Sequence, residues 1–291
     1  MIVFPMSNSL ELGKSIAKKT GAKLGKLKSE LFPDGEFHMQ FLDPIKDKEV
    51  VLVQSLHPNP NDTLMELYFA GRTAKELGAK KVTGVVPYLA YMRQDKRFHA
   101  GEIVSNNLMA HLLNTCLDRI ITVDPHLHRV HNLAELFHID RKKITANEAI
   151  ADYIAEKFSK FDTVIIGPDI ESYQWASRIA EKIKFPSSIF LKERFSSRKV
   201  KVKVMKELEW KGKKVIIVDD IISSGHTMIE AIKEIKKKKV KEIHCICVHG
   251  VFAENAFEKM KKAGAKTIIS CNTIPHKSNG IDLAEMIVEQ L

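Results

Sequence analysis

Residues 215–228, VIIVDDIISSGHTM, constrain the fold more than any other stretch of this chain. Val215–Val218 are four consecutive branched apolar residues, which is typical of a strand buried on both faces in a parallel sheet. After a short polar loop, apolar residues recur with the spacing of an amphipathic helix, at Met228, Ala231, Ile232 and Ile235. The stretch therefore predicts a strand, a loop and a helix of a parallel α/β sheet.

Asp219 and Asp220 directly follow this strand, and a loop rich in Ser, Gly, His and Thr leads into the helix. In open α/β sheets, ligands bind at the carboxyl ends of the strands. The N–H groups and the dipole at a helix N-terminus favour an anion such as phosphate. The motif therefore predicts a phosphate-binding edge that also carries two carboxylates.

Strand-like and helical patterns alternate along the rest of the chain. Strands are expected at 2–4, 50–54, 81–86, 119–123, 163–167, 188–191, 215–218, 243–248 and 267–270, and helices at about 8–19, 62–77, 102–116, 145–158, 171–184, 227–238, 253–263 and 281–290. Thr63 and Glu66 have the spacing of a capping box at the start of the second helix. This alternation over 291 residues predicts two α/β domains with mainly parallel sheets flanked by helices.

Charge and cysteine content narrow the class of protein. The net charge of +10 suits small polyanions such as sugar phosphates and nucleotides. We expect Lys236–Lys239 to be a solvated helix end rather than a nucleic-acid patch. The four cysteines lie in apolar segments, which predicts reduced core thiols of a cytoplasmic protein. No apolar run approaches the roughly 20 residues that span a bilayer, so a membrane is not an expected partner. Neither half of the chain is a basic arm, so a nucleic acid is not an expected partner either.

Polar side chains recur just after the expected strands. They are Arg93, Gln94 and Asp95 after the third strand, Asp124 and His126 after the fourth, Asp169 after the fifth, and Lys192 and Arg194 after the sixth. Such convergent loops suit a site for polyphosphate and metal. His126 and Asp169 would form a nitrogen and oxygen pair for Mg²⁺, which usually takes one or two protein ligands plus phosphates and water.

The segment from Lys192 to Lys214 holds ten basic residues against three acidic ones, with few large apolar residues. It cannot bury much surface, so we expect a mobile hairpin or flap. A plain solvated connection is the alternative, but Lys192 and Arg194 directly follow a strand end.

The chain resembles the ribose-phosphate pyrophosphokinases, also called phosphoribosyl pyrophosphate synthetases, over nearly its whole length. The matching motifs, in order, are FPDGE (32–36), NDTLMEL (61–67), VVPYLAYMRQDK (85–96), ITVDPH (121–126), GPD (167–169), KER (192–194), VDDIISSGHT (218–227), HGVF (249–252) and NTIP (272–275). The opening motif alone would indicate only the wider phosphoribosyl-binding group, which includes the salvage phosphoribosyltransferases.

The resemblance implies two phosphoribosyltransferase-like domains, residues 1–143 and 144–291, with the last helix able to pack on the first domain. It also implies an enzyme of nucleotide biosynthesis. Such an enzyme transfers the diphosphoryl group of ATP to the anomeric hydroxyl of ribose 5-phosphate, giving 5-phosphoribosyl 1-pyrophosphate and AMP.

The resemblance also assigns roles to residues. Asp219 and Asp220 would hold the ribose hydroxyls, directly or through Mg²⁺, and Lys192 and Arg194 would be the catalytic cations over the β-phosphate. The 5-phosphate would be held by Ser223, Ser224, Gly225, His226 and Thr227. His126 and Asp169 would serve the Mg²⁺ on ATP.

The nucleotide would be bound by Arg93, Gln94 and Asp95 together with His126. Phe32, Asp34 and Glu36 would contact adenine from a neighbouring subunit of a homo-oligomer. Pro-Asp-Gly is also a strong turn signal, and FPDGE can serve both purposes.

Three positions depart from the family pattern: the run Ile170-Glu171-Ser172 replaces a glycine pair, His226 occupies a place where a smaller residue is commoner, and Pro125 replaces leucine. These keep open a catalytically weak regulatory relative that binds nucleotide. A salvage phosphoribosyltransferase would need neither the FPDGE nor the RQD segment, and a nucleic-acid-binding protein would need a basic helix or aromatic platform.

Overall fold

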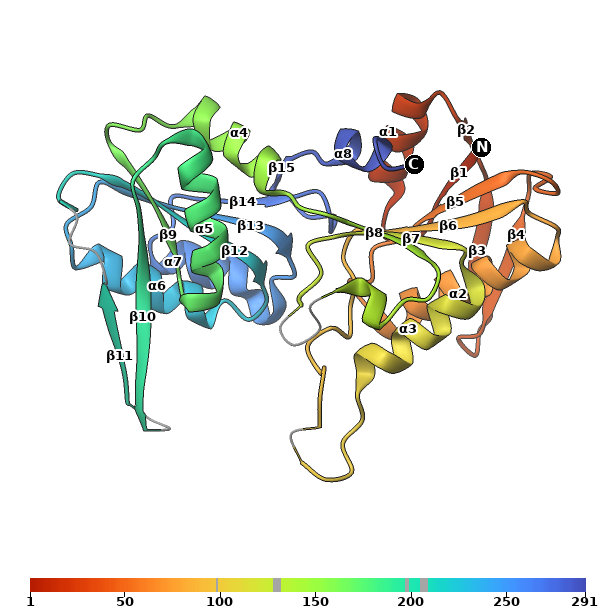
Figure 1. The fold of residues 1–291 in the computed structure, drawn as a ribbon, viewed down its shortest axis with the longest axis horizontal. Coiled ribbons are helices and arrows are strands. Elements are labelled where there is room, and N and C mark those ends of the chain that lie inside the picture. Colours follow the sequence, from red (N-terminus) through yellow and green to blue (C-terminus); the bar gives the residue numbers. More distant parts are fainter. Residues whose placement is uncertain (98, 128–131, 197–198, 205–208) are drawn as a thin grey trace. The chain divides into compact units, whose positions relative to one another are not determined.

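The computed structural model describes residues 1–97, 99–127, 132–196, 199–204 and 209–291, without the side chains of residues 170, 171, 174, 189–196 and 199–204. The chain forms two compact units (Figure 1). The first contains residues 1–145, 273–275 and 283–291, and the second contains residues 146–272 and 276–282.

The first unit is built on a six-stranded parallel sheet in the order β2-β1-β5-β6-β7-β8. The strands are β1 (Ile2–Pro5), β2 (Lys23–Leu24), β5 (Glu49–Val53), β6 (Lys81–Val86), β7 (Arg119–Val123) and β8 (Asp140–Ile144). Helices α2 (Pro60–Glu76) and α3 (Ser105–Cys116) cover one face, and α1 (Leu10–Thr20) covers the other (Figure 1). The short helix α8 (Ala284–Val288) packs against α1.

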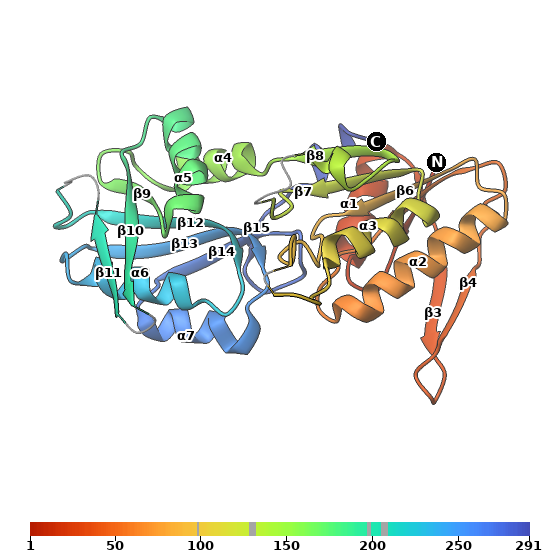
Figure 2. The same cartoon turned by 60° about the horizontal axis from the view of Figure 1, so that its bottom comes forward.

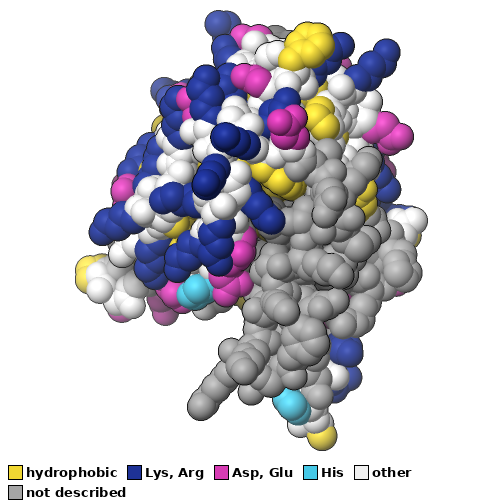
Figure 3. Space-filling view, turned by 90° about the vertical axis from the view of Figure 1, so that its left-hand side faces the viewer, with side chains coloured by type: hydrophobic (Ala, Val, Ile, Leu, Met, Phe, Trp, Pro, Cys, Tyr) yellow, Lys and Arg dark blue, Asp and Glu magenta, His cyan; other side chains and the backbone are white. Residues whose placement is uncertain are grey.

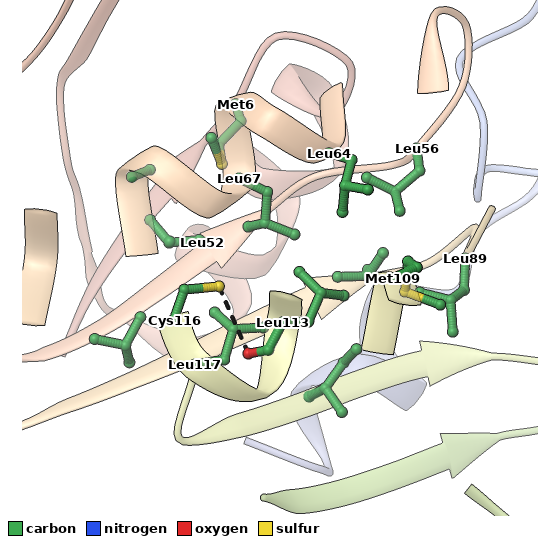
Figure 4. Packing of buried hydrophobic residues seen from close by; sticks show 14 of the residues in the cluster. Met6, Leu52, Leu56, Leu64, Leu67, Leu89, Met109, Leu113, Cys116 and Leu117 are labelled. Carbon is green, nitrogen blue, oxygen red and sulfur yellow. Dashed lines mark hydrogen bonds between the residues drawn. The ribbon is translucent and has the colours of Figure 1, made fainter. Parts of the chain in front are cut away.

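The core of this unit lies between the sheet and helices α2 and α3. Leu52 of β5, Leu67 of α2 and Leu113 of α3 are all fully buried and point toward one another (Figure 4). Cys116 lies in the same cluster, where its Sγ–H donates to the Leu113 carbonyl at 3.5 Å. Burial raises the pKa of this thiol to about 12.

An antiparallel hairpin, β3 (Leu27–Leu31) and β4 (Phe37–Phe41), projects from the first unit (Figure 2). None of its ten strand residues is buried, because the hairpin forms a sheet of its own. A 3₁₀ turn at Leu133–Glu135 leads into the edge strand β8, four of whose five residues are exposed.

The second unit has a seven-stranded sheet in the order β11-β10-β9-β12-β13-β14-β15, parallel except for the β10–β11 pair. The strands are β9 (Thr163–Gly167), β10 (Ser187–Ser196), β11 (Lys199–Val204), β12 (Lys214–Ile222), β13 (Glu242–Gly250), β14 (Thr267–Cys271) and β15 (Asn279–Ile281). Helices α4 (Asn147–Lys157) and α5 (Ile170–Ile183) lie on one face, and α6 (His226–Lys236) and α7 (Ala256–Ala263), preceded by a 3₁₀ turn at Ala253–Asn255, lie on the other (Figure 2).

Two α/β units with mainly parallel sheets are therefore confirmed, and all nine expected strands and all eight expected helices are present. β10 and β12 extend beyond their expected ends at 191 and 218, because they go on pairing with β11 and β13. The expectation that Lys192, Arg194, Asp219 and Asp220 follow strand ends was therefore wrong, since all four lie within strands. The hairpin expected after Lys192 is confirmed as the β10–β11 pair, while its mobility stays a prediction. The buried thiols are confirmed, because all four cysteines are free and buried.

The prediction of a capping box at Thr63 was wrong. Helix α2 begins at Pro60 with Asn59 at its N-cap, and the Thr63 hydroxyl donates to the Asn59 carbonyl at 3.0 Å. Glu66 is buried and accepts hydrogen bonds from Ser7 Oγ at 2.5 Å and from Gln54 Nε2 at 2.6 Å. The pattern was misread because a buried polar network and a capping box require the same residue types.

The basic run Lys236–Lys239 is exposed at the end of α6, as expected for a solvated helix end. Lys237 forms an ion pair with Glu234 one turn earlier, at 2.5 Å. On the face that Figure 3 shows, Lys and Arg side chains are numerous, with Asp and Glu among them.

Candidate active site

The opening motif forms the edge predicted for it. β12 pairs in parallel with β9 on one side and β13 on the other, and Val215–Val218 are fully buried. The strand extends through Asp219 and Asp220, which therefore lie at its carboxyl end. A loop of three residues, Ser223–Gly225, then leads into α6.

Gly225 shapes the start of α6. It is the N-cap residue with φ +73°, a conformation that other residues rarely adopt. A Cβ on Gly225 would lie 3.0 Å from Ala256 Cβ. No side chain of the described residues caps this helix, so the N–H groups of its first turn are available to a bound anion.

His226 is exposed at the first position of α6, and its Nδ1 lies 2.9 Å from Ser224 Oγ. The imidazole thus contacts the loop side chain instead of blocking the helix end. An unusual occupant of this position is compatible with a phosphate subsite, since the donors there are mainly backbone N–H groups.

Asp169 joins this site from the neighbouring strand. It follows β9 and is the N-cap of α5, and its Oδ1 accepts from Ser172 N–H at 2.9 Å and from Ser172 Oγ at 2.7 Å. The same Ser172 Oγ lies 2.8 Å from Asp219 Oδ1. Sequence reasoning missed Ser172 as a contributor, although it had marked this position as unusual.

The electrostatics of the site centre on Asp219. The residue is only 9% exposed, and burial raises its pKa well above the usual value of 3.8. The neighbouring carboxylates of Asp220 and Asp169 raise this pKa further, because like charges oppose ionisation. A bound cation or hydroxyl donors would stabilise these neighbouring carboxylates, because they offset the negative charge.

Lys192 and Arg194 lie on β10, where they pair with Val202 and Val200 of β11. β10 pairs in parallel with β9, the strand that precedes Asp169, so the hairpin lies next to that strand in the sheet. The side chains of both residues lie outside the described part of the structure, and their roles stay predictions.

In the first unit, the RQD segment and His126 follow adjacent strands. Arg93, Gln94 and Asp95 come after β6, and half-buried His126 comes after β7, which pairs with β6 in parallel. Tyr91 fixes the segment before them, because its hydroxyl donates to Asn61 Oδ1 near the start of α2. These predicted nucleotide ligands therefore share one sheet edge.

FPDGE forms the tip of the β3–β4 hairpin. The turn predicted for Pro-Asp-Gly is confirmed by the bond from Gly35 N–H to the Phe32 carbonyl at 2.8 Å and by φ +94° at Gly35. Phe32, Asp34 and Glu36 are all exposed, and Phe32 is 48% accessible. The loop presents an aromatic ring and carboxylates to solvent.

A cavity of about 460 Å³ lies between the segment after the RQD motif and the start of α3. Its lining combines Arg97 and Glu102 with the apolar side chains of Ile103 and Leu108. Sequence reasoning did not single out this cavity, because its residues carry no spacing signal of their own.

Among the described residues, no group of three or more His, Cys, Asp or Glu side chains is arranged to enclose a metal ion. Mg²⁺ bound through one or two carboxylates and substrate phosphates does not need such a group. The acids at the ends of β9 and β12 are of the right chemical type for it.

No helix of the described chain is both long and apolar enough to cross a membrane.

Residues 1–116 match the family model of the N-terminal domain of ribose phosphate pyrophosphokinase, and residues 132–285 match that of the phosphoribosyl transferase domain.

Curated relatives match over almost the full length. A ribose-phosphate pyrophosphokinase of Methanopyrus kandleri is 32% identical over 99% of this chain and 98% of its own, and one of Methanobrevibacter smithii is 35% identical over 98% of each. The solved structure of phosphoribosylpyrophosphate synthetase from Mycobacterium smegmatis superposes with a TM-score of 0.86 at 26% identity, covering 100% of this chain and 96% of that one.

The raised pKa of Asp219 makes stability depend on pH. The folded state holds this proton at pH values where the unfolded state, with a pKa near 3.8, has lost it. The associated stability is fully present below that value and is lost as the pH rises through the folded pKa. We therefore expect Asp219→Asn to raise the free energy of unfolding by about 1–3 kcal/mol at about pH 8 and by less at about pH 5.

Thermal unfolding at the two pH values measures this difference. Asp162→Asn is the matched control in the same unit. Although burial opposes it, hydrogen bonding to Thr163 and Lys214 lowers the pKa of Asp162, so the same substitution there should not stabilise the fold. Equal stabilisation by Asp219→Asn at both pH values would contradict the assignment.

Proposed function

The chain belongs to the ribose-phosphate pyrophosphokinase family and makes 5-phosphoribosyl 1-pyrophosphate. We propose that it does so at the strand edges described above. There it would transfer the diphosphoryl group of ATP to the anomeric hydroxyl of ribose 5-phosphate. The observation that carries this proposal is the connection from β12 to α6. It combines two acids near a strand end with a helix N-terminus that no described side chain caps.

The ribose 5-phosphate half of the site lies in the second unit. The Ser223–Gly225 loop and the first two residues of α6, His226 and Thr227, would bind the 5-phosphate through backbone N–H groups and hydroxyls, with His226 holding Ser224 in place. Asp220, which is more exposed than Asp219, would accept from the ribose hydroxyls, with Asp219 behind it. The N–H groups would then face the phosphate, and the carboxylate would face the ribose hydroxyls.

The ATP half uses loops of the first unit. Arg93 and Gln94 would bind the phosphates and the sugar, and Asp95 would orient this segment. Phe32 would stack on adenine while Asp34 or Glu36 accepts from its exocyclic amine. The exposure of all three hairpin residues suits contact with a ligand held mainly elsewhere.

Mg²⁺ is the cofactor that this chemistry requires, because the transferred group carries dense negative charge. Asp169 and His126 would be its protein ligands. When bound, the ion would neutralise charge on the ATP phosphates. The carboxylate of Asp169 is already oriented by two hydrogen bonds from Ser172, which suits a ligand that must hold one position.

Lys192 and Arg194 would act from the β10–β11 hairpin. Phosphoryl transfer depends on positioning and charge neutralisation more than on covalent help from the protein. Cations on a hairpin that closes over both substrates would stabilise the β-phosphate in the transition state and exclude water.

The rival functions fit less well. A salvage phosphoribosyltransferase would leave the match of residues 1–116 to the pyrophosphokinase N-terminal domain without purpose. A regulatory relative without turnover would not need Lys192, Arg194, Asp169 and both acids of β12, and all are retained.

We further propose a homo-oligomer in which FPDGE reaches the nucleotide of a neighbouring subunit. The hairpin exposes Leu31 (62%) and Phe32 (48%), and such apolar exposure suits contact with a second copy. The cytoplasm is the proposed location, because four buried free cysteines suit a reducing compartment.

The reaction can be followed through AMP. We expect AMP to form from ATP only when both ribose 5-phosphate and Mg²⁺ are present, and removal of Mg²⁺ with a chelator to stop it. Chromatographic separation of the nucleotides measures this directly. AMP release independent of ribose 5-phosphate would contradict the proposal.

Lys192→Ala should lower kcat by on the order of 100-fold or more while changing the KM of either substrate by less than about threefold, because its contact belongs to the transition state. Lys203→Ala is the matched control, since it removes the same charge from the paired strand β11. Equal losses in both variants would assign the effect to hairpin charge in general.

A shared site can be tested by mixing inactive subunits. Phe32→Ala and Lys192→Ala disable different parts of the site. If FPDGE serves a neighbouring subunit, subunits exchanged between the two variants should form some intact sites and recover part of the activity. No recovery in mixtures whose exchange is verified by mass spectrometry would place the complete site within one chain.

A further inference from the structure

Ser172 lies between two carboxylates that come from different segments of the chain. It belongs to the first turn of α5 and is only 4% exposed. Its Oγ lies 2.7 Å from Asp169 Oδ1 and 2.8 Å from Asp219 Oδ1. One buried hydroxyl therefore links the acid after β9 to the acid at the end of β12.

This link depends on a close approach of α5 to the sheet. Gly167 ends β9, and a Cβ on it would lie 2.6 Å from Tyr173 N and 2.8 Å from the Ser172 carbonyl carbon. Those atoms are backbone and cannot move aside, so the approach requires glycine. Because Ile166 of β9 pairs with Ile217 of β12, the first turn of α5 comes to lie beside Asp219.

The hydroxyl of Ser172 has a different task from its backbone. The Ser172 N–H donates to Asp169 and completes the N-cap of α5, and this bond persists whatever side chain follows. The hydroxyl alone reaches Asp219. Removing it separates the link between the acids from the capping of the helix.

We propose that Ser172 is a positioning residue of the reaction, which fixes the Asp169 carboxylate relative to Asp219 and thereby sets the spacing of the two substrates. This rests on the function proposed above, in which Asp169 serves the metal–nucleotide and Asp219 the ribose. Both acids turn Oδ1 toward Ser172, so the contact determines where each Oδ2 lies. In-line transfer is sensitive to such spacing, since small displacements of reacting groups cost large rate factors.

The mechanism predicts a coupled defect. Without the hydroxyl, Asp169 and Asp219 lose their common hydrogen-bond partner, and both carboxyl groups should shift or take up water. We expect Ser172→Ala to raise the KM of ribose 5-phosphate and of ATP together, each on the order of tenfold, and to lower kcat as well. Ser172→Thr retains the hydroxyl and should restore both KM values to within about threefold of the starting protein.

Ser270→Ala is the matched control. Ser270 is a fully buried serine of the same unit whose Oγ lies 2.7 Å from Ser278 Oγ. The Ser270→Ala variant loses a comparable hydrogen bond elsewhere in the unit, so this substitution should lower the melting temperature without changing either KM. If the Thr variant does not fold, the contrast between Ser172→Ala and Ser270→Ala decides alone.

Calorimetric binding of ribose 5-phosphate provides a readout that does not require turnover. A starting protein that binds ribose 5-phosphate, with weaker binding in Ser172→Ala, supports the proposal. Unchanged binding and unchanged KM values in Ser172→Ala overturn it and leave the proposed function intact. A starting protein that neither binds ribose 5-phosphate nor forms AMP overturns the proposed function, and the role of Ser172 with it.

Discussion

The second unit depends on the parallel pairing of β9, β12 and β13. This pairing brings the carboxyl ends of neighbouring strands to one edge, so Asp169 lies near Asp219 and Asp220 although it is far from them in sequence. Their mutual repulsion is the cost of the arrangement. It is offset locally by the Ser172 hydroxyl and by the Asp220 N–H, which donates to Asp219 Oδ1 at 3.0 Å.

The sequence predicted the parts of this fold that have strong periodicity. Fully apolar strands such as β12 and amphipathic helices such as α6 were identified, and so was the turn at FPDGE. Among the strands that escaped prediction, β3 and β8 are largely exposed and polar, so no alternation of buried and exposed residues marks them. β4 does alternate between half-buried and exposed residues, and this signal was missed. Strands at an edge or in a separate hairpin are defined by pairing, which spacing does not encode.

Prediction of the site was limited in a different way. Asp219, Asp220 and Ser223–Thr227 all lie within one short segment of the chain, so local sequence was enough to recognise them. Ser172 is defined by its contact with Asp219, 47 positions away, and by the missing Cβ of Gly167. The wrong prediction of a capping box has the same cause, because Glu66 pairs with Ser7 and Gln54, which follow β1 and β5, rather than with its own helix. Partners distant in sequence decide what a polar residue does.

Cys247 of β13 lies directly across from Asp219 in the register of the sheet. Burial raises the pKa of this thiol well above its ordinary value, and the nearby Cys271 and Asp219 raise it further. A protonated, enclosed thiol is a poor nucleophile and reacts slowly with peroxide or electrophiles. The strand beside the acidic site therefore carries sulfur in a form that oxidants attack slowly.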